Sequence, residues 1–174
     1  KETYNFNLKS RETFILANNW FMVFFLVTVL IGMLYPIFLD VLTNVKISVG
    51  PPFFNIVIIP LVVPLMVLMA IGPKFGWIKS QSQIFHKIIF LILGAVIINL
   101  FIFYFFGKYG FLSNLIFIAA IFLILYSLLD IKKIFNNKNK VELPRVISHL
   151  SFGLLVFFIG INHQFSLEED FNLK

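Results

Sequence analysis

The sequence predicts an all-α fold, a polytopic integral membrane helical bundle with about five transmembrane helices. Hydrophobic residues make up 60% of the 174 residues and charged residues only 13%, whereas a soluble domain is about half apolar and a quarter charged. Mean hydropathy is +0.96. The apolar residues fall in runs of about twenty, the length that crosses a bilayer as a helix. Most side chains are therefore expected to face lipid or other membrane helices.

Each predicted span is bounded by residues that start or stop helices. Arg11 and Glu12 form a helix-start pair before the first span, after a polar N-terminal stretch. Gly50-Pro51-Pro52 then marks a rigid non-helical loop, because proline lacks an amide donor and clashes with the preceding turn. The same prolines can begin the second helix, where a missing N–H costs nothing. The predicted spans are Thr13–Leu39, Pro52–Ile71, Ile84–Phe106, Phe111–Leu129 and Pro144–Ile161.

Features inside and between the later spans refine this picture. Pro60 and Pro64 are expected to kink the second helix, with the freed carbonyls satisfied by a neighbour or by water. Residues 107–110 read Gly-Lys-Tyr-Gly and predict a tight hairpin between the third and fourth helices. The polar stretch Asp130–Glu142 is predicted to be a short loop before the fifth helix. Residues 1–162 thus form the predicted transmembrane region, and 163–174 an outer-face tail that begins a truncated outer domain.

The distribution of Lys and Arg predicts the orientation. With five spans the two ends of the chain lie on opposite sides, and eleven basic residues collect on the N-terminal side against three on the other. The positive-inside rule then places the N-terminus inside and the C-terminus outside, together with the Gly-Pro-Pro loop and the acidic residues 168–170. The inner group is Lys1, Lys9, Arg11, Lys74, Lys79, Lys87, Lys132, Lys133, Lys138, Lys140 and Arg145; the outer group is Lys46, Lys108 and Lys174.

Composition also excludes several kinds of chemistry. The chain has no cysteine, so disulfides, thiolate metal sites and Cys-x-x-Cys redox chemistry are ruled out within it. The net charge of +6 reflects membrane topology, and no nucleic-acid partner is expected. We find no Ser-His-Asp set, no phosphate-binding glycine loop and no paired intramembrane carboxylates, so no catalytic residue is assigned.

The candidate site centres on His149, about 7 Å inside the last predicted helix at 1.5 Å per residue. A neutral imidazole is a good axial ligand for haem iron, and Arg145 at the inner boundary could meet a haem propionate. Gly153 and Gly160 leave a flat groove that would admit a porphyrin edge or a neighbouring helix. The alternative is that His149 hydrogen-bonds across helices and the small residues are ordinary packing. The predicted face comprises Arg145, Ser148, His149, Phe152, Gly153, Val156 and Gly160.

The other two histidines are weaker candidates. His86 lies near the inner end of the third helix beside Lys87, where an interfacial histidine is common. His163 is predicted just past the last helix as a solvated residue at the outer face.

Several short segments, in order along the chain, resemble one known family. Gly32-Met33-Leu34-Tyr35-Pro36, with Met where threonine is usual, is followed by Ile47 to Asn55 (Ile-Ser-Val-Gly-Pro-Pro-Phe-Phe-Asn). Met69 to Pro73 with Trp77, then His149-Leu150-Ser151 and Phe165 to Glu168, continue the match. Together they resemble the CcmF-type haem lyase of cytochrome c maturation. Ser151 replaces the family's glycine, and the family's tryptophan-rich outer loop and other haem-site histidines are absent.

The resemblance implies that the chain is the C-terminal membrane portion of a haem lyase that attaches haem covalently to apocytochrome c. It implies haem b as cofactor, with His149 as axial ligand to its iron. It also implies partners: other haem lyase subunits or the missing N-terminal half, a haem-delivery chaperone and apocytochrome c. The expected location is a bacterial inner (plasma) membrane or a mitochondrial inner membrane, and the chain alone is not expected to be a competent enzyme. A membrane transport subunit and a structural subunit of a membrane complex stay open as alternatives.

Overall fold

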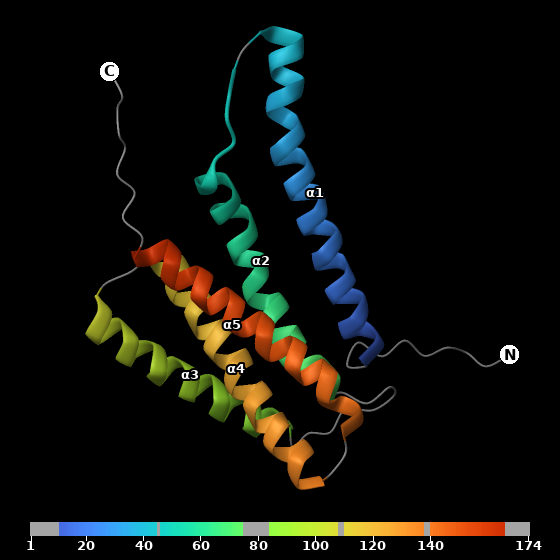
Figure 1. Cartoon of the computed structure of the whole chain (residues 1–174), viewed down its shortest axis with the longest axis vertical. Helices are drawn as coiled ribbons and strands as arrows, with labels where there is room; N and C mark the ends of the chain where they lie inside the picture. The colour runs from blue at the N-terminus through green and yellow to red at the C-terminus, as the bar shows by residue number, and fades with distance from the viewer. Residues whose placement is uncertain (1–10, 45, 75–83, 108–109, 138–139, 166–174) are drawn as a thin grey trace, which may run out of the picture. The chain divides into compact units, whose positions relative to one another are not determined.

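A computed structural model describes residues 11–44, 46–74, 84–107, 110–137 and 140–165. Within these ranges the chain forms five long α-helices and two short 3₁₀ turns, which confirms the all-α prediction (Figure 1). All five helices are long and apolar enough to cross a membrane. Trp77, Lys79 and the acidic residues 168–170 lie outside the described residues. The elements are α1 (Arg11–Thr43), α2 (Pro51–Ile71), η1 (Gly72–Lys74), α3 (Ile84–Phe106), α4 (Phe111–Asn137), η2 (Lys140–Glu142) and α5 (Leu143–Phe165).

The chain divides into two compact units, Lys1–Phe90 and Leu91–Lys174, which we describe separately. In the first unit, α1 begins at Arg11 with Glu12 in its first turn, as predicted for a helix-start pair. The helix runs four residues beyond its predicted end, to Thr43. There the Thr43 hydroxyl donates to the Leu39 carbonyl (2.7 Å). The Asn44 amide donates to the Asp40 carbonyl (3.0 Å), which satisfies one of the carbonyls that a helix end leaves unpaired.

The Gly-Pro-Pro segment starts α2 as its sequence predicts. Gly50 is extended, with φ −104° and ψ −177°, and Pro51 and Pro52 occupy the first helical positions. The Phe53 amide donates to the Gly50 carbonyl (3.1 Å) and closes the first turn. The helix then continues through both internal prolines to Ile71.

Small residues let α1 and α2 approach closely. Gly32 is buried, and its missing side chain leaves room for the ring of Phe54: a Cβ at Gly32 would lie 2.7 Å from Phe54 Cζ. Thr28, one turn earlier on the same face of α1, is also buried. Gly72 similarly leaves room for Phe14: a Cβ at Gly72 would lie 3.2 Å from the Cβ of Phe14. Small residues at such crossings are typical of membrane helix pairs.

In the second unit α4 and α5 pack antiparallel along most of their lengths. Gly153 of α5 lies against Leu123 and Ile124, and Gly160 lies against the ring of Phe117. Phe117 also meets Phe157 edge-on, with ring centroids 5.6 Å apart. The α3 helix is joined to α4 by a side-chain hydrogen bond in which Asn99 Nδ2 donates to Asn114 Oδ1 (3.0 Å).

Two predicted boundaries near α4 and α5 are wrong. The stretch from Asp130 was predicted as a loop, but α4 continues to Asn137. Loss of hydropathy marks the point where a helix leaves the bilayer, and lysine favours a helix nearly as well as leucine does. His163 was placed beyond the last helix, but α5 runs to Phe165 and includes it.

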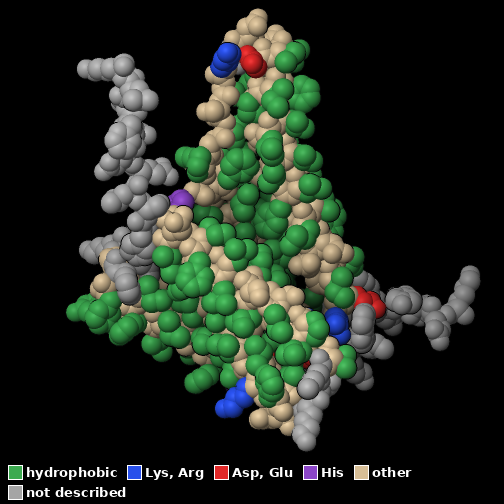
Figure 2. Space-filling view, in the orientation of Figure 1, with side chains coloured by type: hydrophobic (Ala, Val, Ile, Leu, Met, Phe, Trp, Pro, Cys, Tyr) green, Lys and Arg blue, Asp and Glu red, His purple; other side chains and the backbone are tan. Residues whose placement is uncertain are grey.

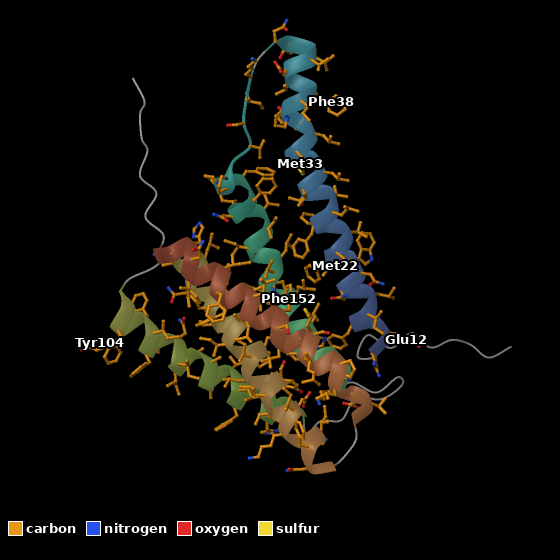
Figure 3. All side chains as sticks on the ribbon, viewed as in Figure 1. Glu12, Met22, Met33, Phe38, Tyr104 and Phe152 are labelled. Atoms are coloured by element: carbon orange, nitrogen blue, oxygen red, sulfur yellow. The ribbon has the colours of Figure 1, made fainter. Side chains whose placement is uncertain are left out.

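The outer surfaces of the helices are strongly apolar. Figure 2 shows hydrophobic side chains covering most of the visible face, with charged groups confined to a few places. Met22, Met33 and Phe38 along α1 and Tyr104 on α3 are all exposed (Figure 3). In water such surfaces would aggregate, so with the five long apolar helices they identify an integral membrane protein.

Candidate functional site

His149 lies near the start of α5, about 9 Å along the axis from its first residue, Leu143. Its side chain is half-buried. Within the described part of the chain, its imidazole makes no hydrogen bond to another residue, and its nitrogens are not fully buried. The imidazole nitrogens are thus available to a ligand.

The packing of α4 against α5 shows which residues face His149. Phe117 meets Gly160, and Gly153 meets Ala120, Leu123 and Ile124, so paired residue numbers sum to between 273 and 277. Extending this antiparallel register by one to two turns places residues 124–128, Tyr126 and Ser127 among them, at about the level of His149. It places residues 128–132, Asp130 among them, at about the level of Arg145. Both α4 side chains are buried at this level, Tyr126 with 4% and Asp130 with 7% of its surface exposed.

Charge links these groups. The charges of Asp130 and Arg145 both act on Tyr126 and on His149. We call Tyr126, Asp130, Arg145 and His149 the α4–α5 polar cluster. It joins a carboxylate, a guanidinium, a phenol and an imidazole at one end of an otherwise apolar helix pair.

Arg145 also has a carboxylate partner at the surface. Its Nη2 lies 2.7 Å from Glu142 Oε2, three residues earlier, and the two side chains are 25% and 49% exposed. Exposed pairs of this kind contribute at most about 1 kcal/mol. Because guanidinium carries five N–H donors, this contact leaves Arg145 able to bind a further carboxylate such as a haem propionate.

The glycine groove predicted on α5 is filled by α4. A Cβ on Gly153 would lie 3.0 Å from Ile124 Cγ1, and one on Gly160 would lie 3.1 Å from Phe117 Cε1. For these two glycines the neighbouring helix, and not a porphyrin edge, is therefore the occupant.

The opposite flank of His149 is still accessible. Arg145, Phe152 and Val156 are half-buried there, and Ser148 beyond them is exposed, its hydroxyl donating to the Pro144 carbonyl (2.9 Å). Figure 3 shows Phe152 on this helix. An apolar strip with a cation at one end and an available imidazole beside it suits an amphipathic planar group such as haem, whose propionates are anionic.

Within its own unit, His149 has no second histidine close enough to form a ligand pair. His163 lies fourteen residues further along the same helix, about 21 Å away, too far to share one iron. His86 is exposed on α3 and belongs to the first unit. Over the described ranges, His, Asp and Glu form no group of three or more that would hold a metal ion. A second axial ligand would have to come from outside this cluster.

The sequence analysis missed Tyr126 and Asp130. Asp130 was read as the first residue of a polar loop, so its burial was not considered. The signal was present as spacing: residues four apart share one helix face, and both stand at the end of the apolar run of α4.

Comparison with known proteins adds relatives that match nearly the whole chain. The chain is 31% identical to the cytochrome c-type biogenesis protein CcmF of Pseudomonas fluorescens over 183 residues, and the match covers 99% of this chain and 28% of that protein. It is 26% identical to CcmF of Escherichia coli K12 over 172 residues, covering 96% of this chain and 27% of that protein. A 72-residue stretch is 42% identical to the cytochrome c-type biogenesis protein CycK of Rhizobium meliloti, covering 41% of this chain and 11% of that protein.

The chain thus spans less than a third of the length of these curated relatives. No family model matches it, and no solved structure does.

Proposed function

Because this chain is a CcmF-type cytochrome c biogenesis protein by its relationship to those proteins along almost its whole length, we propose that it works in cytochrome c maturation. In this proposal it is part of a membrane haem lyase that attaches haem covalently to apocytochrome c. Its own contribution is an axial ligand, His149, to a b-type haem within the membrane. The chain covers 28% of its Pseudomonas fluorescens relative, so it is not proposed to be competent alone.

The observation that carries the proposal is the environment of the His149 side chain. Its imidazole is half-buried, without a hydrogen-bond partner among the described residues, and bordered by half-buried Phe152 and Val156. An uncharged imidazole nitrogen is a standard axial ligand of haem iron. When bound, the haem would supply an iron centre that exchanges single electrons.

The remaining residues of the strip have separate tasks. Phe152 and Val156 would contact the apolar part of the ring and keep water from the iron. Arg145, about one helical turn from His149, would bind a propionate, sharing its guanidinium with Glu142. The packing of α4 against α5 would support the side of the helix away from the haem.

The proposed orientation and membrane location rest on the distribution of basic residues and on similarity to the CcmF proteins. The excess of basic residues on the N-terminal side supports an inside N-terminus and an outside C-terminus, in a bacterial inner membrane or a mitochondrial inner membrane. The proposed partners are other haem lyase subunits or an N-terminal half, a haem-delivery chaperone and apocytochrome c. The surrounding bilayer covers the apolar helix surfaces.

The test is a reduced-minus-oxidised absorption spectrum of the protein purified in detergent with its co-purifying partners. We expect a b-type signal in the wild type that is lost in His149→Ala and kept in His163→Ala, a matched change on the same helix. A signal that survives His149→Ala in folded protein would remove His149 from the site.

A structural role is the competing proposal, because the tight glycine contacts between α4 and α5 need no cofactor. It predicts that a complete complex contains no haem and that His149→Ala leaves assembly unchanged. A transport role would instead depend on Pro60 and Pro64, so substrate flux lost on their replacement, in a complex without haem, would favour transport.

A further inference from the structure

We propose that the C-terminal end of α4 binds phospholipids with anionic headgroups through Lys132 and Lys133. The binding surface, which we call the α4 lipid face, consists of the exposed side chains of residues 128, 129, 132, 133 and 135. None of these residues belongs to the α4–α5 polar cluster, so the inference goes beyond the proposed haem site and does not depend on it. It gives a function to the part of α4 that continues past the predicted span.

The residues of the α4 lipid face lie on the side of the helix that is turned away from its protein neighbours. Residues three and four apart share one face of a helix, so Lys132 and Lys133 follow one turn after Leu128 and Leu129 on the same outward surface. All four are exposed. The buried residues of these turns lie on the other side of the helix: Tyr126, Ser127, Asp130 and Ile134.

The length of α4 places the two lysines at a bilayer surface. The helix begins at Phe111, and at 1.5 Å per residue Lys132 lies about 32 Å along the axis from it. The hydrocarbon core of a bilayer is about 30 Å thick. An upright α4 with Phe111 at one edge of the core therefore brings Lys132 and Lys133 to the headgroups at the opposite edge.

Both lysines are available to an anion. Over the described ranges, neither of them forms an ion pair with another residue. The acidic residues closest to them in the described sequence are placed elsewhere, because Glu142 lies 2.7 Å from Arg145 and Asp130 is buried. Two uncompensated ammonium groups at headgroup level attract anionic lipids.

The apolar neighbours of the lysines indicate a lipid in preference to a soluble anion or an acidic protein segment. Phe135, almost one turn after Lys132, is 67% exposed, and Leu128, one turn before it, is 48% exposed. Leucine, phenylalanine and lysine together are the composition with which helices bind the boundary between headgroups and acyl chains of anionic membranes. The lysine stems can lie along this apolar surface while their ammonium groups reach the phosphates.

The test is native mass spectrometry of the full chain, purified in detergent with its co-purifying partners, delipidated, and titrated with phosphatidylglycerol or phosphatidylcholine of the same acyl chains. We expect the wild type to bind phosphatidylglycerol more tightly. The double variant Lys132→Gln/Lys133→Gln should bind it about thirtyfold more weakly, at about fivefold for each lysine, with the affinity for phosphatidylcholine unchanged.

Two control variants keep the preference for phosphatidylglycerol. Lys132→Arg/Lys133→Arg retains both charges, and Lys46→Gln removes one exposed charge from the first unit. Inorganic phosphate at matched ionic strength should displace phosphatidylglycerol no better than chloride does, because the acyl chains contribute to binding. Displacement by phosphate alone would identify a site for the free anion and overturn the inference.

Other results would also overturn it. One is a wild type that binds the two lipids equally, which would leave the lysines only a role in orientation. Another is a preference for phosphatidylglycerol that survives Lys132→Gln/Lys133→Gln. A co-purifying protein lost from that variant, without any lipid preference in the wild type, would assign the lysines to an acidic protein partner instead. A wild-type complex without haem would contradict the proposed function and leave this inference intact.

Discussion

Gly32→Ala tests the closest helix contact in the first unit. The new Cβ would lie 2.7 Å from Phe54 Cζ and 2.9 Å from Phe54 Cε1, with Phe53 at 3.3 Å. Real Cβ contacts are essentially never shorter than 3.0 Å, so the aromatic pair or the helix must move. Overpacking of this kind costs about 1–3 kcal/mol. Alanine in a helix interior is favoured over glycine by about 0.5–1 kcal/mol, so we expect a net loss of about 1–2 kcal/mol.

A matched variant isolates the packing term. Gly94 lies inside α3 with its nearest neighbour, Leu125 Cδ1, 4.0 Å from the new Cβ position. Gly94→Ala should therefore keep the helix gain and be neutral to stabilising. The free energies of unfolding are to be compared in mixed detergent micelles. Phe54→Leu should reduce the cost of Gly32→Ala, because leucine lacks the ring atoms Cε1 and Cζ that lie closest to Gly32.

The reasoning is refuted if Gly32→Ala stabilises the protein as much as Gly94→Ala does. That outcome would mean that α1 and α2 do not meet at Gly32. A cost of Gly32→Ala that is unchanged by Phe54→Leu would separately show that the ring is not the obstacle.

Three further predictions follow from other contacts. Asn99→Ala and Asn114→Ala should show a coupling of about 0.6 kcal/mol in a double-mutant unfolding cycle, typical of hydrogen bonds between membrane helices; purely additive effects would contradict the bond. Gly153→Leu should destabilise by about 1–3 kcal/mol through overpacking against α4, whereas Ser151→Leu, on the exposed face, should change stability by under about 0.5 kcal/mol. Because the chain has no cysteine, Ser48→Cys should react with a membrane-impermeant maleimide added outside; labelling from the inside alone would reverse the predicted orientation.

Much of the fold was predictable because it depends on local chemistry. The apolar runs identified all five helices of the described residues, and four of their ten ends, Ile71, Ile84, Phe106 and Phe111, agree with the structure to the residue. The start of α2 followed from Gly50-Pro51-Pro52, since proline restricts the backbone whatever lies around it. The end of α4 was misjudged because hydropathy reports where lipid ends, while helix formation depends on backbone hydrogen bonds that continue into polar sequence.

The candidate site was predictable in part. His149 and Arg145 were identified because ionisable residues are rare in apolar helices. The occupant of the Gly153–Gly160 groove was not decided by the sequence, which left both a porphyrin edge and a neighbouring helix open. The side chain of Phe117, from another helix, settles it.

By itself the sequence determined that this is a membrane protein of five helices, with a proline-initiated second helix and a histidine placed within the last. These properties follow from hydropathy and backbone restriction, which act on neighbouring residues. The tertiary structure decided which residues meet across helices: Phe54 with Gly32, Asn99 with Asn114, and Phe117 with Gly160. Such pairings depend on the register between helices, which is set by the fit of many side chains at once and is not carried by any single segment.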